Sequence, residues 1–311
     1  MKKSGLRWRQ PPLWLAAAQA ATRQRAAALL PQSRQLLLAI TLIAGPKQIA
    51  ILDGVRNEVR VVDGATYKTN ETPVDAVFVK NDLYVLERDS RTLSLAGTSK
   101  RVQVDDDPAF VRESNGRLYV YSRATGIVQE ITRDLAITRR LAGSPFASDF
   151  EIIGRNGYLV FPREAKLRTF SLSSMTMLGE IKVGAVPVDL ASAGGNTLAI
   201  ADPSAKRVWL IEGEQTLTQA IARGFIRGLL GLGLAPNRHS EFPTGVDRVA
   251  SRGRSRVAYD SSTGTLYRFD DHRVTVIERN VAPGSWALTD DGIAVWDGTA
   301  LRLHKIGAGE P

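Results

Sequence analysis

Four aspartates each lie two or four residues after a proline, at the start of a stretch that we predict to be a strand. They are Asp75, Asp149, Asp189 and Asp247. Carboxylates that converge in this way can bind a hard cation such as Ca²⁺, or raise one another's pKa values for acid-base chemistry. Alternatively, each aspartate accepts a backbone N–H in its own turn and recurs only because the surrounding unit recurs. The arrangement of the elements around them decides between these two interpretations.

A strand-turn-strand unit recurs seven times along the chain. Each copy has a short buried strand that ends at a polar or turn-forming residue, then a turn, then a second apolar run. The first strands of the copies are Ala50-Ile51-Leu52-Asp53, Tyr84-Val85-Leu86-Glu87, Tyr119-Val120-Tyr121-Ser122, Leu159-Val160-Phe161-Pro162, Ala199-Ile200-Ala201-Asp202, Val257-Ala258-Tyr259-Asp260 and Ala294-Val295-Trp296-Asp297. In the fourth copy, Arg168 stands where the other copies have an apolar residue.

Successive copies are 34, 35, 40, 40, 58 and 37 residues apart. A period near 40 with strand patterning is typical of the four-stranded blade of a β-propeller, such as a WD40-like repeat. We therefore predict an all-β, single-domain β-propeller with seven four-stranded blades over residues 36–311. In the fifth copy the predicted strands are residues 188–191, 197–201, 207–211 and 216–222. The innermost strands line a central channel, so the four aspartates are expected at its mouth.

The last copy reaches Pro311 after only three strands. The N-terminal segment, just before or within residues 30–43, is expected to close the ring as the missing strand, because closure removes exposed sheet edges. This interpretation makes residues 36–43 part of the propeller. A six-bladed ring with one composite blade is the alternative if the chain is cleaved after Gly45.

Residues 1–35 form a basic leader with seven Lys or Arg residues and no Asp or Glu. A short apolar stretch followed by Ala18-Gln19-Ala20 is typical of a signal peptide, and so is the apolar run at residues 36–45. Neither run reaches the ~18 to 20 apolar residues of a membrane-spanning helix. We expect an exported protein, periplasmic or secreted, or a cytoplasmic one if the leader is an N-terminal helix rather than a signal.

The net charge of +9 belongs mostly to this leader, which argues against a nucleic-acid-binding surface on the folded domain. The chain has no cysteine, which excludes disulfides, thiolate zinc sites and cysteine nucleophiles. No phosphate-binding loop, dinucleotide motif or Gly-x-Ser-x-Gly elbow is present. The three histidines, His239, His272 and His304, do not form a metal-binding pattern.

The 58-residue interval contains an apolar, glycine-rich insert at residues 225–242. Because the insert follows the predicted outermost strand 216–222, we expect it on the same face as the channel mouth. There it can serve as a lid, a partner-docking loop or a membrane-touching tip, or it can be a loop that plugs the channel. His239 and Glu241 within it also have metal-compatible spacing. The candidate partner or ligand residues are Phe225, Ile226, Arg227, Leu229, Leu230, Leu232, His239 and Glu241.

The fifth copy resembles the YVTN repeat of YncE-like bacterial propellers. Residues 181–191, with Val183-Gly184 and Pro187, match the opening of that repeat, and Leu198–Asp202 and Val208–Ile211 match its two apolar runs. The Tyr-Val-Leu and Tyr-Val-Tyr copies echo it, whereas the Val-Gly opening is mostly lost elsewhere. The resemblance implies a propeller over residues 46–311 and an extracytoplasmic binding or scaffold protein. Related seven-bladed lactonases imply that the same ring can also host an enzyme.

Our first functional hypothesis is a non-enzymatic, exported propeller that binds a protein or small-molecule ligand at the channel face. The alternative is a metal-assisted hydrolase of the lactonase kind, in which a cation at the channel mouth polarises a carbonyl and activates water. We expect no resident cofactor for the first hypothesis, and Ca²⁺ at the four aspartates for the second. Membrane contact is expected only through the leader or the insert.

Overall fold

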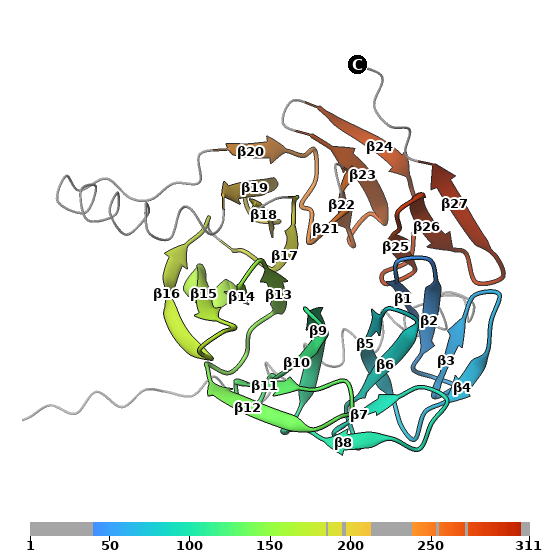
Figure 1. Ribbon diagram of the computed structural model, residues 1–311. Helices are drawn as coiled ribbons and strands as arrows, with labels where there is room; N and C mark the ends of the chain where they lie inside the picture. Colours follow the sequence, from blue (N-terminus) through green and yellow to red (C-terminus); the bar gives the residue numbers. More distant parts are fainter. Residues whose placement is uncertain are drawn as a thin grey trace, which may run out of the picture.

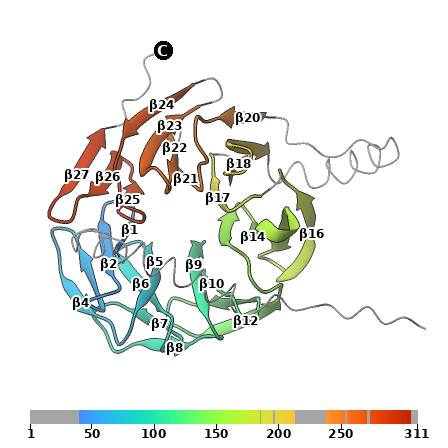
Figure 2. The same ribbon diagram turned by 180° about the vertical axis from the view of Figure 1, so that it is seen from behind.

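A computed structural model of the protein describes residues 40–184, 186–194, 197–212, 238–252, 255–270 and 273–305. Over these residues the chain forms seven antiparallel sheets arranged as a ring, with one strand of each sheet at the centre (Figures 1 and 2). The prediction of an all-β propeller with seven blades is confirmed, and the six-bladed alternative is wrong. No helix among the described residues is long and apolar enough to cross a membrane.

The first four blades run from the innermost to the outermost strand. Blade 1 comprises β1 (Ile40–Ala44), β2 (Ile49–Asp53), β3 (Glu58–Val61) and β4 (Thr66–Lys68). Blade 2 comprises β5 (Pro73–Val79), β6 (Asp82–Glu87), β7 (Thr92–Leu95) and β8 (Arg101–Gln103). Blade 3 comprises β9 (Pro108–Ser114), β10 (Arg117–Ser122), β11 (Ile127–Ile131) and β12 (Ile137–Ala142). Blade 4 comprises β13 (Asp149–Ile153), β14 (Asn156–Phe161), the 3-10 turn η1 (Pro162–Glu164), β15 (Lys166–Ser171) and β16 (Thr176–Lys182).

The last three blades follow the same plan. Blade 5 comprises β17 (Asp189–Ser192), β18 (Thr197–Asp202), β19 (Arg207–Glu212) and β20 (Arg238–Glu241). Blade 6 comprises β21 (Arg248–Arg252), β22 (Ser255–Asp260), β23 (Thr265–Phe269) and β24 (Val274–Glu278). Blade 7 comprises β25 (Trp286–Leu288), β26 (Gly292–Trp296) and β27 (Leu301–Lys305), so its sheet has three strands within the described residues.

Burial explains the sequence pattern of the repeat. The second strand of each blade lies between two strands of its own sheet and between two neighbouring blades, and all six residues of β14 are buried. The outermost strand has solvent on one side, and β16 is mostly exposed. A nearly continuous apolar run therefore marks the second strand, as expected for a strand covered on both faces.

Each of the seven gaps between neighbouring blades has its own cluster of buried apolar residues. The cluster between blades 3 and 4 contains twelve buried residues, including Tyr121, Phe150 and Phe170. Among the described residues, the cluster between blades 7 and 1 has three buried members, Leu42, Ala287 and Ala294, with five partly buried apolar residues packed against them. The ring is thus held together by apolar contacts all the way round, and within the described ranges the contact between its two ends has the fewest buried residues.

The ring closes where β1 meets β25. Leu42 donates its backbone N–H to the carbonyl oxygen of Gly284 at 2.8 Å, directly before β25. We predicted that residues within or just before 30–43 would be the fourth strand of the last blade. The described part of that segment, from Ile40, is instead the innermost strand of blade 1, and residues 1–39 lie outside the described residues.

Strand register corrects the predicted alignment of the fourth copy by one residue. Val160 pairs with Leu167, as Leu86 pairs with Leu93 in blade 2. The fourth copy is therefore residues 158–161, and Leu167 rather than Arg168 fills the apolar position of its third strand. The exception at Arg168 was an error of alignment, because a shift of one residue moves every side chain to the other face of a strand.

Residues 238–241 of the predicted insert form β20, the fourth strand of blade 5, which pairs with β19. The prediction that these four residues belong to a loop is therefore wrong. We expected the fourth strand at residues 216–222 and the insert after it; residues 213–237 lie outside the described residues. Each inner strand starts on the face of the ring that we call the entrance face.

Candidate functional site

Asp75, Asp149 and Asp189, which we call the inner carboxylates, lie near the start of three inner strands, β5, β13 and β17. They occupy equivalent places, since Asp75 pairs with Leu86, Asp149 with Val160 and Asp189 with Ala201 on the second strands. All three therefore lie on the side of their strand that faces the neighbouring blade and the centre of the ring. This is the end at which we expected the channel mouth.

Each inner carboxylate accepts a backbone N–H from the inner strand of the next blade. Asp75 accepts that of Val111 at 2.9 Å. Asp149 accepts that of Leu190 at 2.9 Å, and Asp189 accepts that of Val249 at 2.7 Å. The interpretation that each aspartate binds within its own turn is therefore incomplete, because these bonds join one blade to the next.

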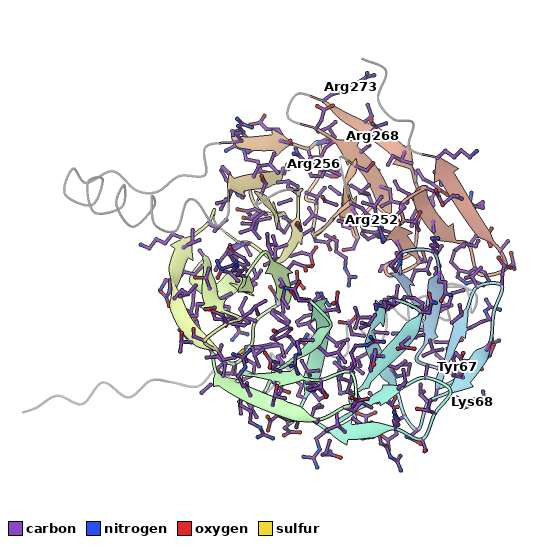
Figure 3. The ribbon with its side chains drawn as sticks, viewed as in Figure 1. Tyr67, Lys68, Arg252, Arg256, Arg268 and Arg273 are labelled. Carbon is purple, nitrogen blue, oxygen red and sulfur yellow. The ribbon has the colours of Figure 1, made fainter. Side chains whose placement is uncertain are left out.

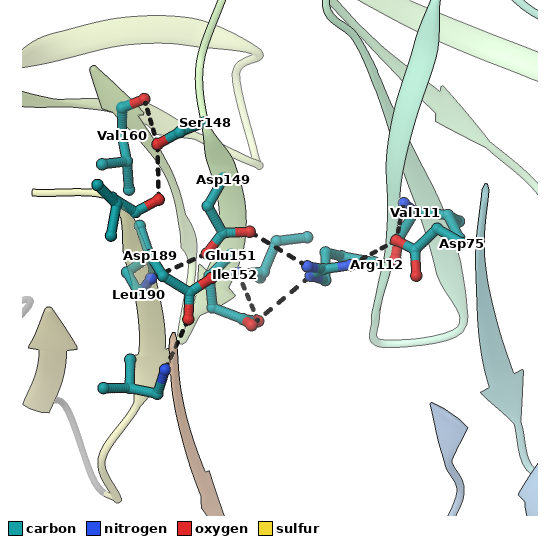
Figure 4. A network of polar contacts seen from close by, with 12 residues as sticks. Asp75, Val111, Arg112, Ser148, Asp149, Glu151, Ile152, Val160, Asp189 and Leu190 are labelled. Atoms are coloured by element: carbon teal, nitrogen blue, oxygen red, sulfur yellow. Dashed lines mark hydrogen bonds and ion pairs between the residues drawn. The ribbon is translucent and has the colours of Figure 1, made fainter. Parts of the chain in front are cut away.

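Arg112 lies at the centre of these carboxylates (Figure 4). It extends from β9, and its Nη1 donates to Asp75 at 2.8 Å and to the carbonyl oxygen of Val111 at 2.9 Å. Its Nη2 lies 3.5 Å from Asp149, and its Nε lies 3.6 Å from Glu151, the second residue after Asp149. One guanidinium thus bridges carboxylates of blades 2 and 4 across blade 3.

Burial shifts the pKa of every member of this cluster. Desolvation raises the pKa of Asp75 and of Glu151, and the nearby Arg112 only partly offsets this effect. For Arg112 itself, burial alone would lower the pKa, but the surrounding carboxylates, Asp75 foremost, outweigh it and raise the pKa. Arg112 therefore stays charged, and the cluster combines one fixed positive charge with acids that lose their protons reluctantly.

Asp149 and Asp189 are adjacent buried carboxyl groups. Burial raises the pKa of both groups, and the Asp149 carboxylate raises that of Asp189 further, to well above its ordinary value. At Asp149, Arg112 and the N–H of Leu190 oppose the effect of burial. This pair therefore loses its protons less readily than isolated aspartates do.

Asp247 does not join the cluster. It precedes β21, and the residue of blade 6 that pairs as the inner carboxylates do is Arg248, opposite Tyr259. A one-residue offset turns the side chain of Asp247 to the other side of the strand, where it accepts hydrogen bonds from the N–H and hydroxyl of Ser261. Arg248 instead lies close enough to Asp189 to lower the pKa of that carboxyl slightly against the larger effect of burial.

The arrangement of donors around the inner carboxylates does not fit a divalent cation. Their oxygens already accept backbone N–H groups or face Arg112, whereas Ca²⁺ requires about 6 to 8 oxygen ligands. Over the described ranges, no group of three or more His, Asp or Glu side chains is placed to hold a metal ion.

Two of the predicted loop residues are described, and both lie on β20. The ring of His239 packs against Trp209, with 5.3 Å between centroids, and Glu241 forms an ion pair with Arg207 at 2.7 Å. These contacts give both side chains partners within blade 5. The remaining six residues, Phe225, Ile226, Arg227, Leu229, Leu230 and Leu232, lie outside the described residues, as does His272.

Three residues of the cluster were not predicted from the sequence: Arg112, Glu151 and Arg248. Each is charged and lies on an inner strand, at a position where another blade has an apolar or acidic residue. Arg112, for example, corresponds to Val77 in blade 2. A charged side chain within an inner strand was the available signal. Its importance becomes clear only when the blades are aligned by strand register.

Comparison with solved structures places the chain among β-propellers. One similar structure is a catalytically inactive variant of virginiamycin B lyase from Staphylococcus aureus with quinupristin. The similarity covers 86% of this chain and 92% of the other, at a TM-score of 0.63 and 12% identity. The chain is also similar over 83% of its length to 89% of the WD40 β-propeller domain of Doa1, at a TM-score of 0.61 and 11% identity.

A third similar structure is KlHsv2 with its loop 6CD replaced by a Gly-Ser linker, at a TM-score of 0.53 and 12% identity over 78% of this chain and 84% of the other. No protein-family model matches the chain, and no curated protein matches its sequence. At identities this low, the similarity of these structures shows a shared fold and no more.

Proposed function

We propose that this protein is a non-catalytic, exported propeller of the YVTN or YncE-like kind that binds a ligand or partner at the entrance face. The observation that carries the proposal is an excess of acidic over basic side chains around Arg112. The four carboxyl groups of Asp75, Asp149, Glu151 and Asp189 lie with only two arginines, Arg112 and Arg248. The chemistry best suited to this site is an organic cation, such as the ammonium group of a small amine or of a partner's lysine.

Glu151 is the carboxylate best suited to receive such a cation. One of its oxygens accepts the N–H of Ile152 at 2.9 Å, and the other lies 3.6 Å from Arg112. Its side chain is 26% exposed, compared with 6% for Asp149. A single ammonium group can bind one accessible carboxylate without displacing Arg112, whereas a divalent cation needs several oxygens at once.

Calorimetric titration with cadaverine tests this proposal. We expect binding that Glu151→Gln weakens about tenfold, the effect of losing one charge-assisted hydrogen bond. The matched control is Glu71→Gln, because Glu71 is exposed and its carboxylate makes no hydrogen bond or ion pair among the described residues. Absence of cadaverine binding, or equal binding by the Glu151→Gln variant, would overturn the proposal.

A metal-assisted hydrolase remains the second candidate, because Asp149 and Asp189 are adjacent carboxyl groups of the kind that serve in acid-base chemistry. This candidate requires Ca²⁺ or a similar ion to share the carboxylates with Arg112. Calorimetric titration with Ca²⁺, together with an assay of lactone hydrolysis, separates the two functions. Saturable Ca²⁺ binding with hydrolysis that Asp149→Asn abolishes would favour the enzyme over the binding protein.

The proposed export places a limit on where the leader can be cleaved. Strand β1 pairs with β2 through all five of its residues, and Leu42 is buried against blade 7. Cleavage after Gly45 would remove this strand, so the Ala18-Gln19-Ala20 signal is the one compatible with the ring. Mass spectrometry of protein from the periplasm or culture medium should find a mature N-terminus near residue 21. A mature chain that starts at Pro46, or an uncleaved chain confined to the cytoplasm, would contradict this assignment.

A further inference from the structure

The outer part of the gap between blades 1 and 2 holds a polar cavity of about 290 Å³, far from the inner carboxylates. One wall comes from β4 and the residues that follow it, and the other from β7, β8 and the turn between them. Figure 3 shows Tyr67 and Lys68 at this outer rim, on the side of blade 1 that meets blade 2. A second hollow of about 350 Å³ continues from it toward the face opposite the entrance face and shares Tyr67, Leu95, Ala96 and Thr98.

Tyr67 departs from the repeat at this place. It pairs with Val59, and the equivalent residues of the next three blades are aliphatic: Val102, Leu141 and Ile181. The ring of Tyr67 packs so closely on Gly97 that a Cβ there would lie 2.8 Å from the ring. Gly97 also has a φ of +76°, which glycine adopts without strain. Blade 1 thus places a phenol where the next three blades have an aliphatic side chain and blades 5 and 6 have Ser240 and Glu278, and blade 2 leaves room for it.

Several polar groups around the cavity have no partner in the described part of the chain. The hydroxyl of Tyr67 and the side chains of Asn70, Ser99, Lys100 and Arg101 line the cavity and make no hydrogen bond or ion pair there. At the interface between blades 3 and 4, a comparable group is bonded: Arg139 of β12 binds Glu130 and the carbonyl oxygens of Leu172 and Ser173 on blade 4. The hydrogen-bonding capacity of the cavity is therefore available to a ligand.

The charges around the cavity favour an anion. Four charged side chains line it: Lys68, Glu87, Lys100 and Arg101. Lys68 is bonded to Glu58 at 2.9 Å, and Glu87 is 1% exposed and accepts hydrogen bonds from Ser90 and Ser94. Neither therefore has much capacity left for a ligand, whereas Lys100 and Arg101 are exposed at the opening. Together they offer a positive charge pair beside an aromatic ring and two neutral donors.

We propose that this cavity is a binding site for a sugar-sized ligand that bears a tetrahedral oxyanion, a phosphate or sulfate ester. Lys100 and Arg101 bind the oxyanion, and Arg supplies the paired donors that suit such groups. The ring of Tyr67 lies against the sugar, and its hydroxyl, with Asn70 and Ser99, binds the sugar hydroxyls. This site is independent of the cation site at the inner carboxylates, and the two can be tested separately.

Calorimetry at low ionic strength with glucose 6-phosphate, N-acetylglucosamine 6-sulfate and glucose tests the site, because exposed charges are screened by salt. We expect at least one ester to bind and glucose not to bind, and the tighter ester identifies the source of the oxyanion. The double variant Lys100→Gln, Arg101→Gln should weaken binding by tenfold or more, and Tyr67→Phe by a few-fold. Lys182→Gln, which removes an exposed cation on blade 4, should leave binding unchanged.

Three results would overturn this proposal: no binding of either ester, equal binding of glucose, or an unaffected double variant. All of these substitutions are at exposed or half-buried side chains, and the thermal midpoint of each variant should match that of the wild type. The Glu151→Gln variant should bind the esters normally. Failure of one site therefore cannot be mistaken for failure of the other.

Discussion

The propeller contains two sets of aspartates that recur with its blades, and the two sets have opposite properties. The inner carboxylates are Asp75, Asp149 and Asp189. The other set, which we call the turn carboxylates, ends the second strand of a blade and accepts hydrogen bonds from the turn that follows; its members are Asp53, Asp202, Asp260 and Asp297. Inner carboxylates connect different blades, whereas every turn carboxylate binds the turn after its own strand; Asp202 and Asp260 also accept hydrogen bonds from Val186 and Thr244, which precede the first strand of their blade.

The pKa values follow from this difference. Burial would raise the pKa of Asp260, but hydrogen bonds from Ser262, Thr244 and Thr263 outweigh it and lower the pKa. At Asp297, which is exposed, the N–H groups of Ala300 and Thr299 lower the pKa to about 2. At the inner carboxylates, burial outweighs the hydrogen bonds that they accept, so their pKa values rise. Location within the blade, more than residue type, decides which aspartates are stabilised as anions.

The largest effect is expected from Arg112→Ala. This change leaves Asp75, Asp149 and Glu151 buried without their cation, and the loss of one partner from a buried ion pair costs about 3 to 5 kcal/mol. Denaturant unfolding measures this loss. The control is Arg123→Ala. Arg123 lies over the ring of Phe110 and forms no ion pair among the described residues, so its removal should cost less than about 1 kcal/mol. A loss below 1 kcal/mol for Arg112→Ala would show that the inner carboxylates do not depend on their arginine.

The turn carboxylates are tested next by Asp260→Ala. The variant leaves the N–H of Ser262 and the hydroxyls of Ser262 and Thr263 without their acceptor, and we expect a loss of about 1 to 3 kcal/mol in the free energy of unfolding. Asp89→Ala is the matched control, because Asp89 lies in the equivalent turn of blade 2, where Glu87 provides the acceptor. It should stay within about 0.5 kcal/mol of the wild type. Equal losses in the two variants would remove the special role of the turn carboxylates.

The smallest change in stability is expected from Asp189→Asn, because an amide reproduces both the donor to Asp149 and the acceptor for Val249. At pH 7 the variant should be within about 1 kcal/mol of the wild type, or more stable. A pKa raised on folding stabilises the protein below the ordinary aspartate pKa of about 3.9, and this contribution is lost as pH rises through the raised value. Asp189→Asn should therefore flatten the decline in stability above about pH 4.

Asp297→Asn should change the dependence of stability on pH in the opposite direction. The pKa of Asp297 is lowered on folding, so the stability that this carboxylate contributes is present above the ordinary aspartate pKa and is lost as pH falls toward about 2. Unfolding free energies measured from pH 2 to 8 should show the two variants flattening opposite ends of the profile. If stability declined above pH 4 as steeply in Asp189→Asn as in the wild type, the raised pKa of Asp189 would be contradicted.

Local sequence patterns predicted the blades but not the contacts between them. The repeated apolar strand is visible because period-2 alternation and a fixed turn recur within each copy. The position of Asp247 was mistaken because distance from a proline does not reveal which side of a strand a residue faces. Strand register does, and it shows that Arg248 occupies the inner position.

The central arginine was beyond the reach of a local pattern. Asp75, Arg112 and Asp149 belong to three different blades, and Arg112 is 37 residues from each of the two aspartates in the sequence. Their contacts exist only after the ring forms. Tyr67 could have been noticed as an aromatic residue in a predicted outer strand, but the close approach of Gly97 that gives it a site comes from the next blade.

The small contact between blades 7 and 1 has a consequence for how the chain folds. Leu42 and Gly284 are the first and last partners in the ring, and the loop that their contact closes includes most of the protein. During synthesis, β1 is complete long before β25 leaves the ribosome. The side of blade 1 that packs against blade 7 therefore stays exposed to solvent until blade 7 has been made. We expect the last step of folding to be the meeting of these two blades, and hydrogen exchange at Leu42 to report the first opening of the ring.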